Sequence, residues 1–391
     1  MKHLFLAAAG WLLAAAPTLA QKPVVFHTLD GRTLRGPDID RLVQHLMDSA
    51  RVPGLAVALF ENNRVRYLRT YGYRNVATKA PLEPETCMYG ASLSKAVFAY
   101  LVMQLVQEKR LGLDQPLYRY LPKPLPDYDA YRDLAGDARW RLLTARIALT
   151  HSTGLPNWRW IEFDKKLRFK FEPGARYGYS GEGLALLQLV VETITGQGLT
   201  QLSEARVFRP LGMRRTSYVW QPAFEQNYAL GYDEQGQPLE KHRRTKPQAS
   251  GSLETTPTDY AAFLAAVMQG RGLGAKARRE MTRTQLRIPY RAQFGPLAAV
   301  AAPDSNRTIR LGYGLGWGTF ESPHGHAYFK EGHDDGWENH SVVFGDRKTA
   351  ILLLGNSSNA DRIYMALLAR LLGDTATPAQ WENYAPYQPG R

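Results

Sequence analysis

Hydrophobic residues recur at helical spacing in several separate stretches of the chain. After Pro37, apolar positions three and four residues apart share one face, which predicts an amphipathic helix. Ser92 begins a second such stretch, which we expect to end at Gly112, and a third covers residues 182–195 with Gly196 as its stop. The three apolar faces are Ile39, Leu42, Val43, Leu46 and Met47; Val97, Phe98, Leu101, Val102, Leu105 and Val106; and Leu184, Leu187, Val191 and Ile194.

The stretches between and after these helices show weaker patterns. Residues 113–175 are rich in turn-forming residues, and they predict loops with one short helix around 144–149. Thr256, Pro257, Thr258 and Asp259 form a capping box with proline in the first turn. This motif predicts a helix that continues to Met268.

Short apolar runs near both ends of the chain predict β-strands. Residues 54–73 have the pattern of a hairpin with a polar turn, and the last third contains four further runs before a closing helix. These runs cover residues 313–320, 326–330, 340–344 and 349–354, and the helix covers 359–372. Strands at both ends predict an α+β fold, with an antiparallel sheet flanked by helices and an all-helical subdomain. We place the sheet at about 36–80 and 310–372 and the subdomain at about 90–270.

The first twenty residues have the pattern of a secretory signal peptide. Lys2 precedes an apolar run over residues 4–16 that is too short to span a bilayer, and Ala20 ends a stretch of small residues suited to cleavage. An uncleaved anchor is the alternative, which the short run disfavours. No second apolar stretch is long enough to cross a membrane. We therefore expect an exported protein, periplasmic or secreted, with one enzyme-sized domain over residues 21–391.

Composition and charge narrow the class of protein further. Hydrophobic residues make up 44% and charged residues 22% of the 391 residues, which is typical of a folded core. Cys87 is the only cysteine, so no internal disulfide forms, and we expect it to be a buried small hydrophobe. The net charge of +13 favours anionic cell-envelope polymers as associates, although the basic cluster at 241–246 is expected to be a solvated loop. No DNA-binding motif occurs, so we expect no nucleic-acid partner.

Ser92 and Lys95 are the first candidates for chemistry. On a helix, residues three apart share a face, so the Lys95 amine would lie within reach of the Ser92 hydroxyl. A serine hydroxyl needs an adjacent base, and lysine serves as one only when burial or a nearby cation keeps it neutral. The helix start also supplies free backbone N–H groups that can stabilise an oxyanion. The alternative is that both residues lie on a polar surface turn.

Tyr179 and His333 are further candidates. Tyr179 lies just before the third helix, and its phenol can relay a proton beside a lysine, although it can equally be a half-buried aromatic. His333 lies between a strand and the turn at Gly336, where it can be a donor or a purely structural residue. His324 and His326 would suggest metal ligands, but no third ligand has suitable spacing. We therefore expect neither a metal nor an organic cofactor.

These motifs, taken in order along the chain, resemble those of a known superfamily. S-x-x-K at Ser92, Y-S-x at Tyr179 and a histidine–glycine turn at 333–336 resemble the serine β-lactamases and penicillin-binding proteins. Within that superfamily, the chain looks most like the class C β-lactamases, the related carboxylesterases and D-amino-acid peptidases. The segments ALTHSTGLPNW, FEPGARYGYSG, ASGSLETTPTDYAAFL and GYGLGWG also match in order, and the likeness covers about residues 36–372.

The resemblance implies a role for each candidate residue. Ser92 would be the acylated nucleophile, Lys95 its activator and Tyr179 the proton carrier. His333 stands where the family has lysine or histidine at the head of its third motif. The oxyanion hole would use the backbone N–H groups of Ser92 and Gly336.

Two departures from the family pattern affect the expected substrate. Gly181 stands where Y-x-N has an asparagine, so this substrate-binding position lacks an amide. Asp334 and Asp335 stand in the third motif, which normally binds the carboxylate of β-lactams and D-Ala-D-Ala termini. If poorly solvated, the two aspartates would repel that carboxylate by about 1 kcal/mol or more. The alternative is that they cap a turn and face solvent.

The resulting hypothesis is an exported serine hydrolase that acts through an acyl-Ser92 intermediate. Its substrate would be a small-molecule or peptide ester or amide, so an esterase or a D-amino-acid or cell-wall peptidase is favoured over an efficient β-lactamase. No G-x-S-x-G elbow occurs, which disfavours an α/β-hydrolase. The alternative is a catalytically weak cell-wall-binding or sensor protein on the same scaffold.

Overall fold

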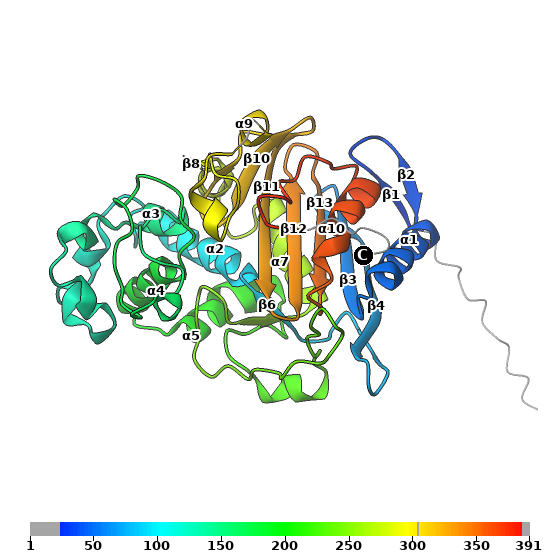
Figure 1. Cartoon of the computed structure of the whole chain (residues 1–391), viewed down its shortest axis with the longest axis horizontal. Coiled ribbons are helices and arrows are strands. Elements are labelled where there is room, and N and C mark those ends of the chain that lie inside the picture. The colour runs from blue at the N-terminus through cyan, green and yellow to red at the C-terminus, as the bar shows by residue number, and fades with distance from the viewer. Residues whose placement is uncertain (1–23, 303–304, 385–391) are drawn as a thin grey trace, which may run out of the picture.

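The computed structural model describes residues 24–302 and 305–384 (Figure 1). The predicted signal peptide, residues 1–20, lies outside the described residues. Within the described part of the chain, no helix is both long and apolar enough to span a membrane.

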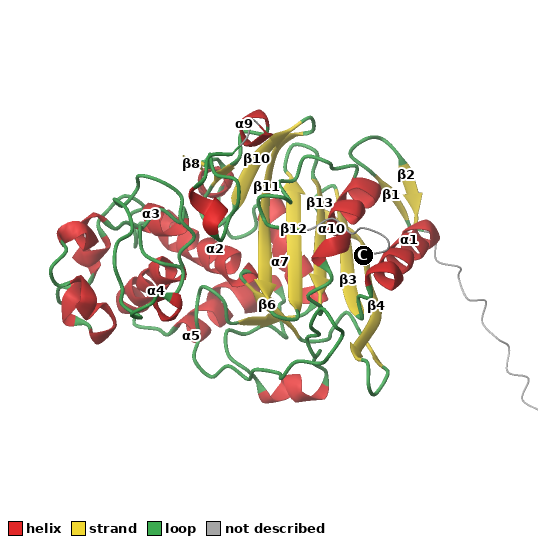
Figure 2. Cartoon of the chain, in the orientation of Figure 1, coloured by secondary structure: helices red, strands yellow, loops and turns green. Residues whose placement is uncertain are grey.

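A large antiparallel sheet forms the centre of the described part (Figures 1 and 2). Nine strands pair in the order β5-β4-β3-β13-β12-β11-β10-β9-β8, so the N-terminal hairpin joins the C-terminal strands where β3 pairs with β13. The strands are β3 (Gly54–Glu61), β4 (Arg64–Asn75), β5 (Ala80–Pro81), β8 (Leu286–Arg287), β9 (Gly312–Tyr313), β10 (Gly318–Ser322), β11 (Gly325–Asp334), β12 (Trp337–Phe344) and β13 (Thr349–Gly355). Two small sheets pair β1 (Val25–His27) with β2 (Thr33–Arg35) and β6 (Met88–Ala91) with β7 (Leu253–Thr255).

Helices cover both faces of the large sheet. Figure 1 shows α10 in front of the central strands and α7 behind them. The alternation of β3 explains this arrangement: one set of side chains packs with α1 and α10, and the other packs on the side of α2 and α7. The first set is Leu55, Val57 and Leu59, and the second is Ala56, Ala58 and Phe60.

The helices agree with most of the sequence-based expectations. They are α1 (Gly36–Ala50), α2 (Leu93–Gln107), α3 (Ala145–Leu149), α4 (Gly181–Thr195), α5 (Leu199–Ser203), α6 (Arg209–Leu211), α7 (Pro257–Gln269), α8 (Ala275–Thr282), α9 (Ser305–Thr308) and α10 (Asp361–Leu367). A π-helical turn at Glu204–Phe208 joins α5 to α6. The segment before α4 contains 3-10 turns at Leu117–Tyr120, Leu125–Asp127, Asp129–Leu134, Ala138–Leu142 and Arg159–Ile161. At α7, the Thr256 side chain accepts a hydrogen bond from the Asp259 N–H, as the capping motif predicts.

Three predicted boundaries are wrong. The helix that follows Ser92 ends at Gln107 rather than Gly112, because Lys109 adopts a left-handed φ of 60° that turns the chain. The predicted strand at 313–320 is two strands, β9 and β10, separated by a turn with Gly316 at φ 82°. The closing helix is α-helical only to Leu367 and finishes with a π-helical segment.

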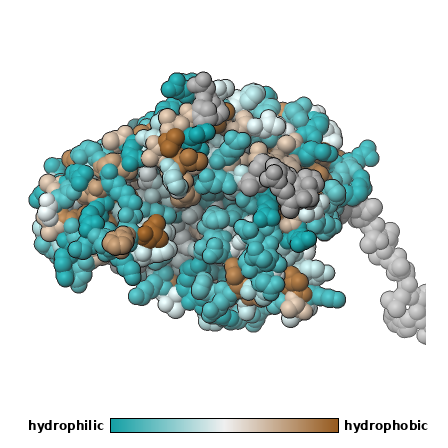
Figure 3. Space-filling model, in the orientation of Figure 1, coloured by the Kyte–Doolittle hydropathy of each residue, from teal (hydrophilic) through white to brown (hydrophobic). Residues whose placement is uncertain are grey.

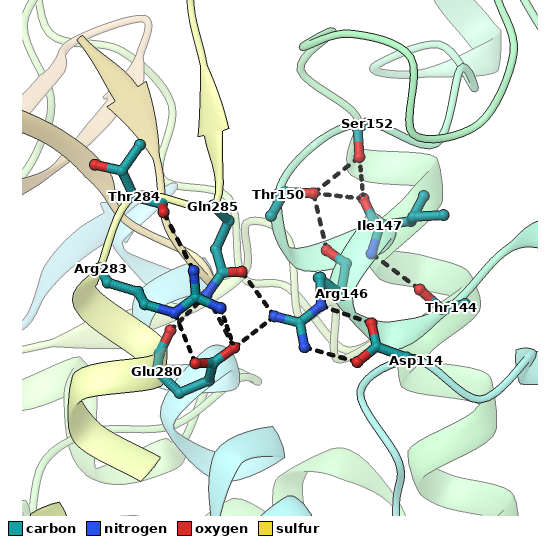
Figure 4. Close-up of polar contacts among 10 residues, drawn as sticks. All are labelled: Asp114, Thr144, Arg146, Ile147, Thr150, Ser152, Glu280, Arg283, Thr284 and Gln285. Atoms are coloured by element: carbon teal, nitrogen blue, oxygen red, sulfur yellow. Dashed lines mark hydrogen bonds and ion pairs between the residues drawn. The ribbon is translucent and has the colours of Figure 1, made fainter. Parts of the chain in front are cut away.

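Arg146 connects the helical part to the segment that leads back into the sheet (Figure 4). Its guanidinium makes paired hydrogen bonds to Asp114 at 2.6 and 2.7 Å. It also reaches Glu280 at 2.6 Å and Gln285 at 2.7 Å, on and just after α8. Because Arg146 lies on α3, these contacts fix the helix that leads into the loop at 151–157. That loop lines the candidate site described next.

Candidate active site

Ser92 lies at a sharp turn between strand β6 and helix α2. Ala91, the last residue of β6, has a left-handed φ of 44°, which is strained for a residue with a Cβ atom. The hydrogen bonds around Ser94 hold this turn, since its hydroxyl donates to the Ala91 carbonyl and accepts from the Leu253 N–H at 3.0 Å. The strained turn presents the Ser92 hydroxyl to a cavity of about 570 Å³.

Lys95 lies directly against the serine, as the sequence predicts. Its Nζ makes a 2.8 Å hydrogen bond to Ser92 Oγ and a second bond to the Ser250 carbonyl. The side chain is 1% exposed. Burial, reinforced by the neighbouring Lys330 ammonium, holds the pKa of Lys95 well below its usual range. A lowered pKa favours the neutral amine, which is the form that can accept the serine proton.

Tyr179 covers the same amine from the other side. Lys95 Nζ lies 4.7 Å from the centre of the Tyr179 ring, and Lys330 Nζ lies 5.4 Å from it. Burial raises the pKa of the phenol well above 10, the Glu331 carboxylate raises it further, and the adjacent Ser92 partly offsets the rise. Its hydroxyl has no hydrogen-bond partner within the described residues. The phenol is thus protonated and available to a bound substrate.

The orientation of Tyr179 depends on a histidine that sequence analysis did not single out. The His151 ring stacks on Tyr179 with centroids 4.2 Å apart, and His151 Nδ1 accepts a hydrogen bond from the Ser180 N–H at 3.1 Å. Burial lowers the pKa of His151 well below 6.5, and the nearby Lys330 ammonium lowers it further, which keeps this nitrogen free to accept. The only signal in the sequence was the family-like segment ALTHSTGLPNW, in which His151 lies.

The cavity brings together the four side chains predicted to be catalytic. Ser92, Lys95, Tyr179 and His333 all line it. His333 lies at the exposed rim, and hydrogen bonding of its Nδ1 to the buried Glu338 carboxyl raises the pKa of His333 to about 9. The cavity lining also includes charged and amide side chains, among them Asn157, Arg244, Gln293, Glu331, Asp334 and Glu382.

Two glycines predicted to contact substrate do not line the cavity. The Gly336 N–H donates to Ser358 Oγ at 2.8 Å, so it is not free to stabilise an oxyanion, and that prediction is corrected. The Gly181 N–H donates to Asn157 Oδ1 at 3.0 Å. A Cβ atom at Gly181 would lie 2.7 Å from the Trp158 ring, so an asparagine here would require the surrounding wall to shift. Asn157 itself lines the cavity and provides an amide there.

The two aspartates of the third motif have different surroundings. Asp334 lines the cavity, accepts a hydrogen bond from the Asp335 N–H at 3.1 Å and lies 3.6 Å from Arg244. Asp335 is exposed and does not line the cavity. The two alternatives were that the aspartates lie in the site or that they cap a turn and face solvent. Each holds in part, because Asp334 caps the turn and also places a carboxylate at the site, whereas Asp335 faces solvent.

The basic cluster at 241–246 is a loop with His242, Arg243 and Lys246 exposed, as expected, but its other two basic side chains pack against the fold. Lys241 is buried and forms a 2.7 Å ion pair with Glu254. Arg244 stacks 3.7 Å above the centre of the Tyr89 ring, at the edge of the cavity. No local pattern in the sequence indicates these contacts. Cys87, as predicted, is buried, and burial raises the pKa of its thiol.

Lys330 and Glu331 form a buried ion pair that sequence analysis also missed. Lys330 Nζ lies 2.6 Å from Glu331 Oε1, and both side chains are at most 5% exposed. The pair lies in β11 beside Lys95 and Tyr179 and influences the pKa of both. The available signal was a lysine and a glutamate side by side where the predicted strand 326–330 ends. In the part of the chain that the structure describes, no group of three or more potential metal-ligating side chains occurs.

An antiparallel sheet flanked by helices, with serine, lysine and tyrosine side chains meeting beside it, defines the β-lactamase and penicillin-binding-protein class of fold. The family model described as Beta-lactamase matches residues 39–374. The chain therefore belongs to the β-lactamase family. This confirms the family resemblance and the α+β fold class that were predicted from the sequence.

Two curated proteins and two solved structures show the range of this similarity. The chain is 24% identical over 213 residues to Protein flp of Staphylococcus aureus (strain MW2), which covers 51% of this chain and 41% of that protein. It is 28% identical over 242 residues to Esterase EstB of Burkholderia gladioli, covering 55% and 58%. The chain thus matches about half the length of these relatives.

The structural neighbours cover more of the chain at lower identity. The octameric penicillin-binding protein homologue from Pyrococcus abyssi superimposes with a TM-score of 0.68 at 22% identity, over 87% of this chain and 78% of that one. The D-alanine carboxypeptidase AmpC from Burkholderia cenocepacia gives a TM-score of 0.64 at 21% identity, over 82% and 93%. At these identities the likeness establishes the fold.

Proposed function

We propose that this protein is an exported serine hydrolase that cleaves an ester or amide through a covalent acyl-Ser92 intermediate. The observation that supports this most is the 2.8 Å contact between the Ser92 hydroxyl and the buried Lys95 amine. Export is proposed from the charge and apolar run of residues 1–20. The proposed chemistry needs side chains and water only.

Each side chain has a defined part in the proposed reaction. Lys95 takes the proton from the Ser92 hydroxyl as Oγ attacks the substrate carbonyl and forms a tetrahedral oxyanion. Backbone N–H groups at the start of α2 stabilise that charge. Tyr179 gives its proton to the leaving group as the bond to it breaks, and the Lys95 ammonium reprotonates Tyr179. Water then attacks the acyl-Ser92 ester and releases the acid.

The charge pattern of the cavity favours an esterase or amine-containing peptide hydrolase over an efficient β-lactamase. Asp334 lines the cavity and would repel a substrate carboxylate, whereas the charge of Glu331 is balanced by its ion pair with Lys330. Arg244 is the one cavity-lining arginine of the described residues, and it already lies near Asp334 and 3.5 Å from Glu254. The names of EstB and the AmpC carboxypeptidase are compatible with either ester or amide cleavage.

The experiment that tests this proposal is covalent labelling combined with ester turnover. A fluorophosphonate should label the protein at Ser92, and the enzyme should release p-nitrophenol from short-chain esters. Ser92→Ala should lose both signals while its circular dichroism stays that of the wild type. Absence of label and turnover in the wild-type protein would overturn the proposal and favour the alternative, a cell-wall-binding or sensor protein on this scaffold.

A panel of substrates separates the remaining possibilities within the proposed class. Short-chain esters, β-lactams and D-amino-acid amides should be compared on one purified sample. We expect esters or amides without a carboxylate near the scissile bond to be the best substrates. Preferential hydrolysis of β-lactams would contradict the electrostatic argument but leave acyl-Ser92 chemistry intact.

A further inference from the structure

One wall of the cavity consists of buried hydrogen-bond acceptors that lack donors. Gln293 Oε1, Glu331 Oε2 and both carboxylate oxygens of Glu382 have no hydrogen-bond partner among the residues that the structure describes. The three side chains are 3%, 4% and 6% exposed, and all line the cavity that contains Ser92. Buried polar atoms are rarely left without partners, so a ligand or water must supply the donors. We call these three residues the acceptor cluster.

The donors near the acceptor cluster are already used. Lys330 Nζ and Gln293 Nε2 both bond to Glu331 Oε1, at 2.6 and 2.9 Å. His340 Nδ1 lies 3.3 Å from Glu382 but outside hydrogen-bond geometry. Gln293 Oε1 and Glu331 Oε2 therefore remain as acceptors only, and they are suited to a ligand rich in N–H groups. Burial raises the pKa of Glu382, so its carboxyl can accept a hydrogen bond and can also carry a proton.

The charge of the acceptor cluster selects among such ligands. Burial alone would raise the pKa of Glu331, but the adjacent Lys330 ammonium outweighs it and holds that pKa below its usual value. A primary ammonium has three donors and a positive charge, which match the amide oxygen and the ionised carboxylate. A carboxylate or phosphate would instead place acceptors against acceptors.

The position of the cluster indicates which half of the substrate it would contact. The Phe294 ring, next to Gln293, packs 5.0 Å from the Tyr179 ring in an edge-on arrangement. Glu331 also lies close enough to Tyr179 to act on its pKa. In the proposed reaction Tyr179 protonates the leaving group, so this side of the cavity receives the leaving group.

We propose that Gln293, Glu331 and Glu382 form a subsite for a protonated primary amine on the leaving-group half of the substrate. This inference rests on the proposed hydrolase function and specifies its substrate class. The preferred substrates are esters or amides whose released alcohol or amine fragment carries an ammonium group. A water molecule in the subsite would satisfy the same acceptors without discriminating between substrates.

The test compares aryl acetates that differ in one terminal group. The 4-(2-aminoethyl)phenyl ester carries an ammonium, the 4-propylphenyl ester is its neutral counterpart of similar shape, and the 4-(2-carboxyethyl)phenyl ester carries a carboxylate. We expect kcat/KM for the ammonium ester to exceed that of the neutral ester by about tenfold or more, and the carboxylate ester to be the poorest.

A variant of the cluster should change this preference. Gln293→Leu, which removes an unpartnered acceptor of the cluster, should reduce the ratio of ammonium to neutral ester by about threefold or more. Because the ratio is taken within one variant, a general loss of activity cancels. Glu85→Gln, which removes an exposed carboxylate outside the cavity, is the matched control and should keep the wild-type ratio.

The outcomes separate the subsite from the proposed function. Equal cleavage of the ammonium and neutral esters by the wild type would overturn the subsite and leave the hydrolase intact. If the wild type cleaves no ester, calorimetry with tyramine and 4-propylphenol tests the subsite by itself. Binding of tyramine alone, weakened in Gln293→Leu, would support the subsite, and no preference for tyramine would refute it.

Discussion

The amine of Lys95 lies 2.8 Å from the hydroxyl of Ser92, inside a wall that leaves the lysine 1% exposed. A serine nucleophile requires a base within contact distance, and a lysine can be that base only when its amine is neutral. Burial and the ammonium of Lys330 both lower the pKa of Lys95 and so favour its neutral form.

Replacing Ser92 should separate catalysis from folding. Ser92→Ala removes the proposed nucleophile, and we expect kcat to fall by more than about a thousandfold. The side chain is only partly buried, so the urea midpoint of unfolding should stay within experimental error of the wild type. Ester turnover and equilibrium unfolding measure the two effects on the same sample. Wild-type turnover in this variant would show that another group is the nucleophile.

Removing the Lys330 charge should change the pH dependence of the reaction. The Lys330 ammonium disfavours a second positive charge on Lys95, so Lys330→Met should let the pKa of Lys95 rise. Because the neutral amine is the active form, the acidic limb of kcat/KM should then move to higher pH. The measurement is the pH–rate profile of an ester whose own ionisation does not change across the range.

Lys241→Met is the matched control for that experiment. Lys241 also forms a buried ion pair, at 2.7 Å to Glu254, but it is not among the charges that influence the pKa of Lys95. Both variants leave a buried carboxylate without its lysine, so a loss of stability is common to them. An unchanged acidic limb in Lys330→Met, or an equal shift in Lys241→Met, would refute the assigned role.

The elements of this fold were largely predictable, because periodic apolar residues define α1, α4, α7 and the strands β3, β4, β12 and β13 locally. Ser92, Lys95 and Tyr179 were also accessible, since their motifs occur in a fixed order. Pairings between distant segments were not. The Gly336 N–H bonds to Ser358 across a turn, and Arg244 packs on Tyr89, and neither contact leaves a local pattern in the sequence.

The acceptor cluster illustrates the same limit. Gln293, Glu331 and Glu382 come from three separate segments, and only the folded sheet places them around one cavity. From the sequence alone, Glu331 looks inconsistent with a buried strand. Only the folded structure shows that an ion pair with Lys330 compensates its burial.

Gly181 should not tolerate a side chain. A Cβ atom there would lie 2.7 Å from the Trp158 ring and 2.8 Å from the Asn157 carbonyl oxygen, so Gly181→Ala requires the wall of the cavity to shift. We expect a loss of about 1–3 kcal/mol in the free energy of unfolding, measured by urea denaturation. Gly198→Ala is the control, because a Cβ atom at Gly198 meets nothing within 4 Å. Equal stability of the two variants would contradict the packing argument.

The Arg146 network should make stability fall in acid. Hydrogen bonds from Arg283, with further bonds from Arg146 and Gln285, lower the pKa of Glu280 from 4.5 to about 2. A carboxyl with a lowered folded-state pKa stabilises the protein above its unfolded pKa, and this contribution disappears as the pH falls from about 4.5 to 2. At neutral pH we expect Glu280→Gln to cost on the order of 1 to 2 kcal/mol, because partial exposure screens the interaction.

The difference in unfolding free energy between wild type and Glu280→Gln should therefore shrink as the pH is lowered toward 2. Urea unfolding at several pH values measures it directly, and Glu162→Gln, at the solvent-exposed ion pair with Lys170, serves as the comparison. That comparison variant should lose less stability at neutral pH, because an exposed pair of this kind contributes little. A difference for Glu280→Gln that stays constant from pH 7 to pH 2 would mean that Glu280 stabilises the fold by packing, with no contribution from its charge.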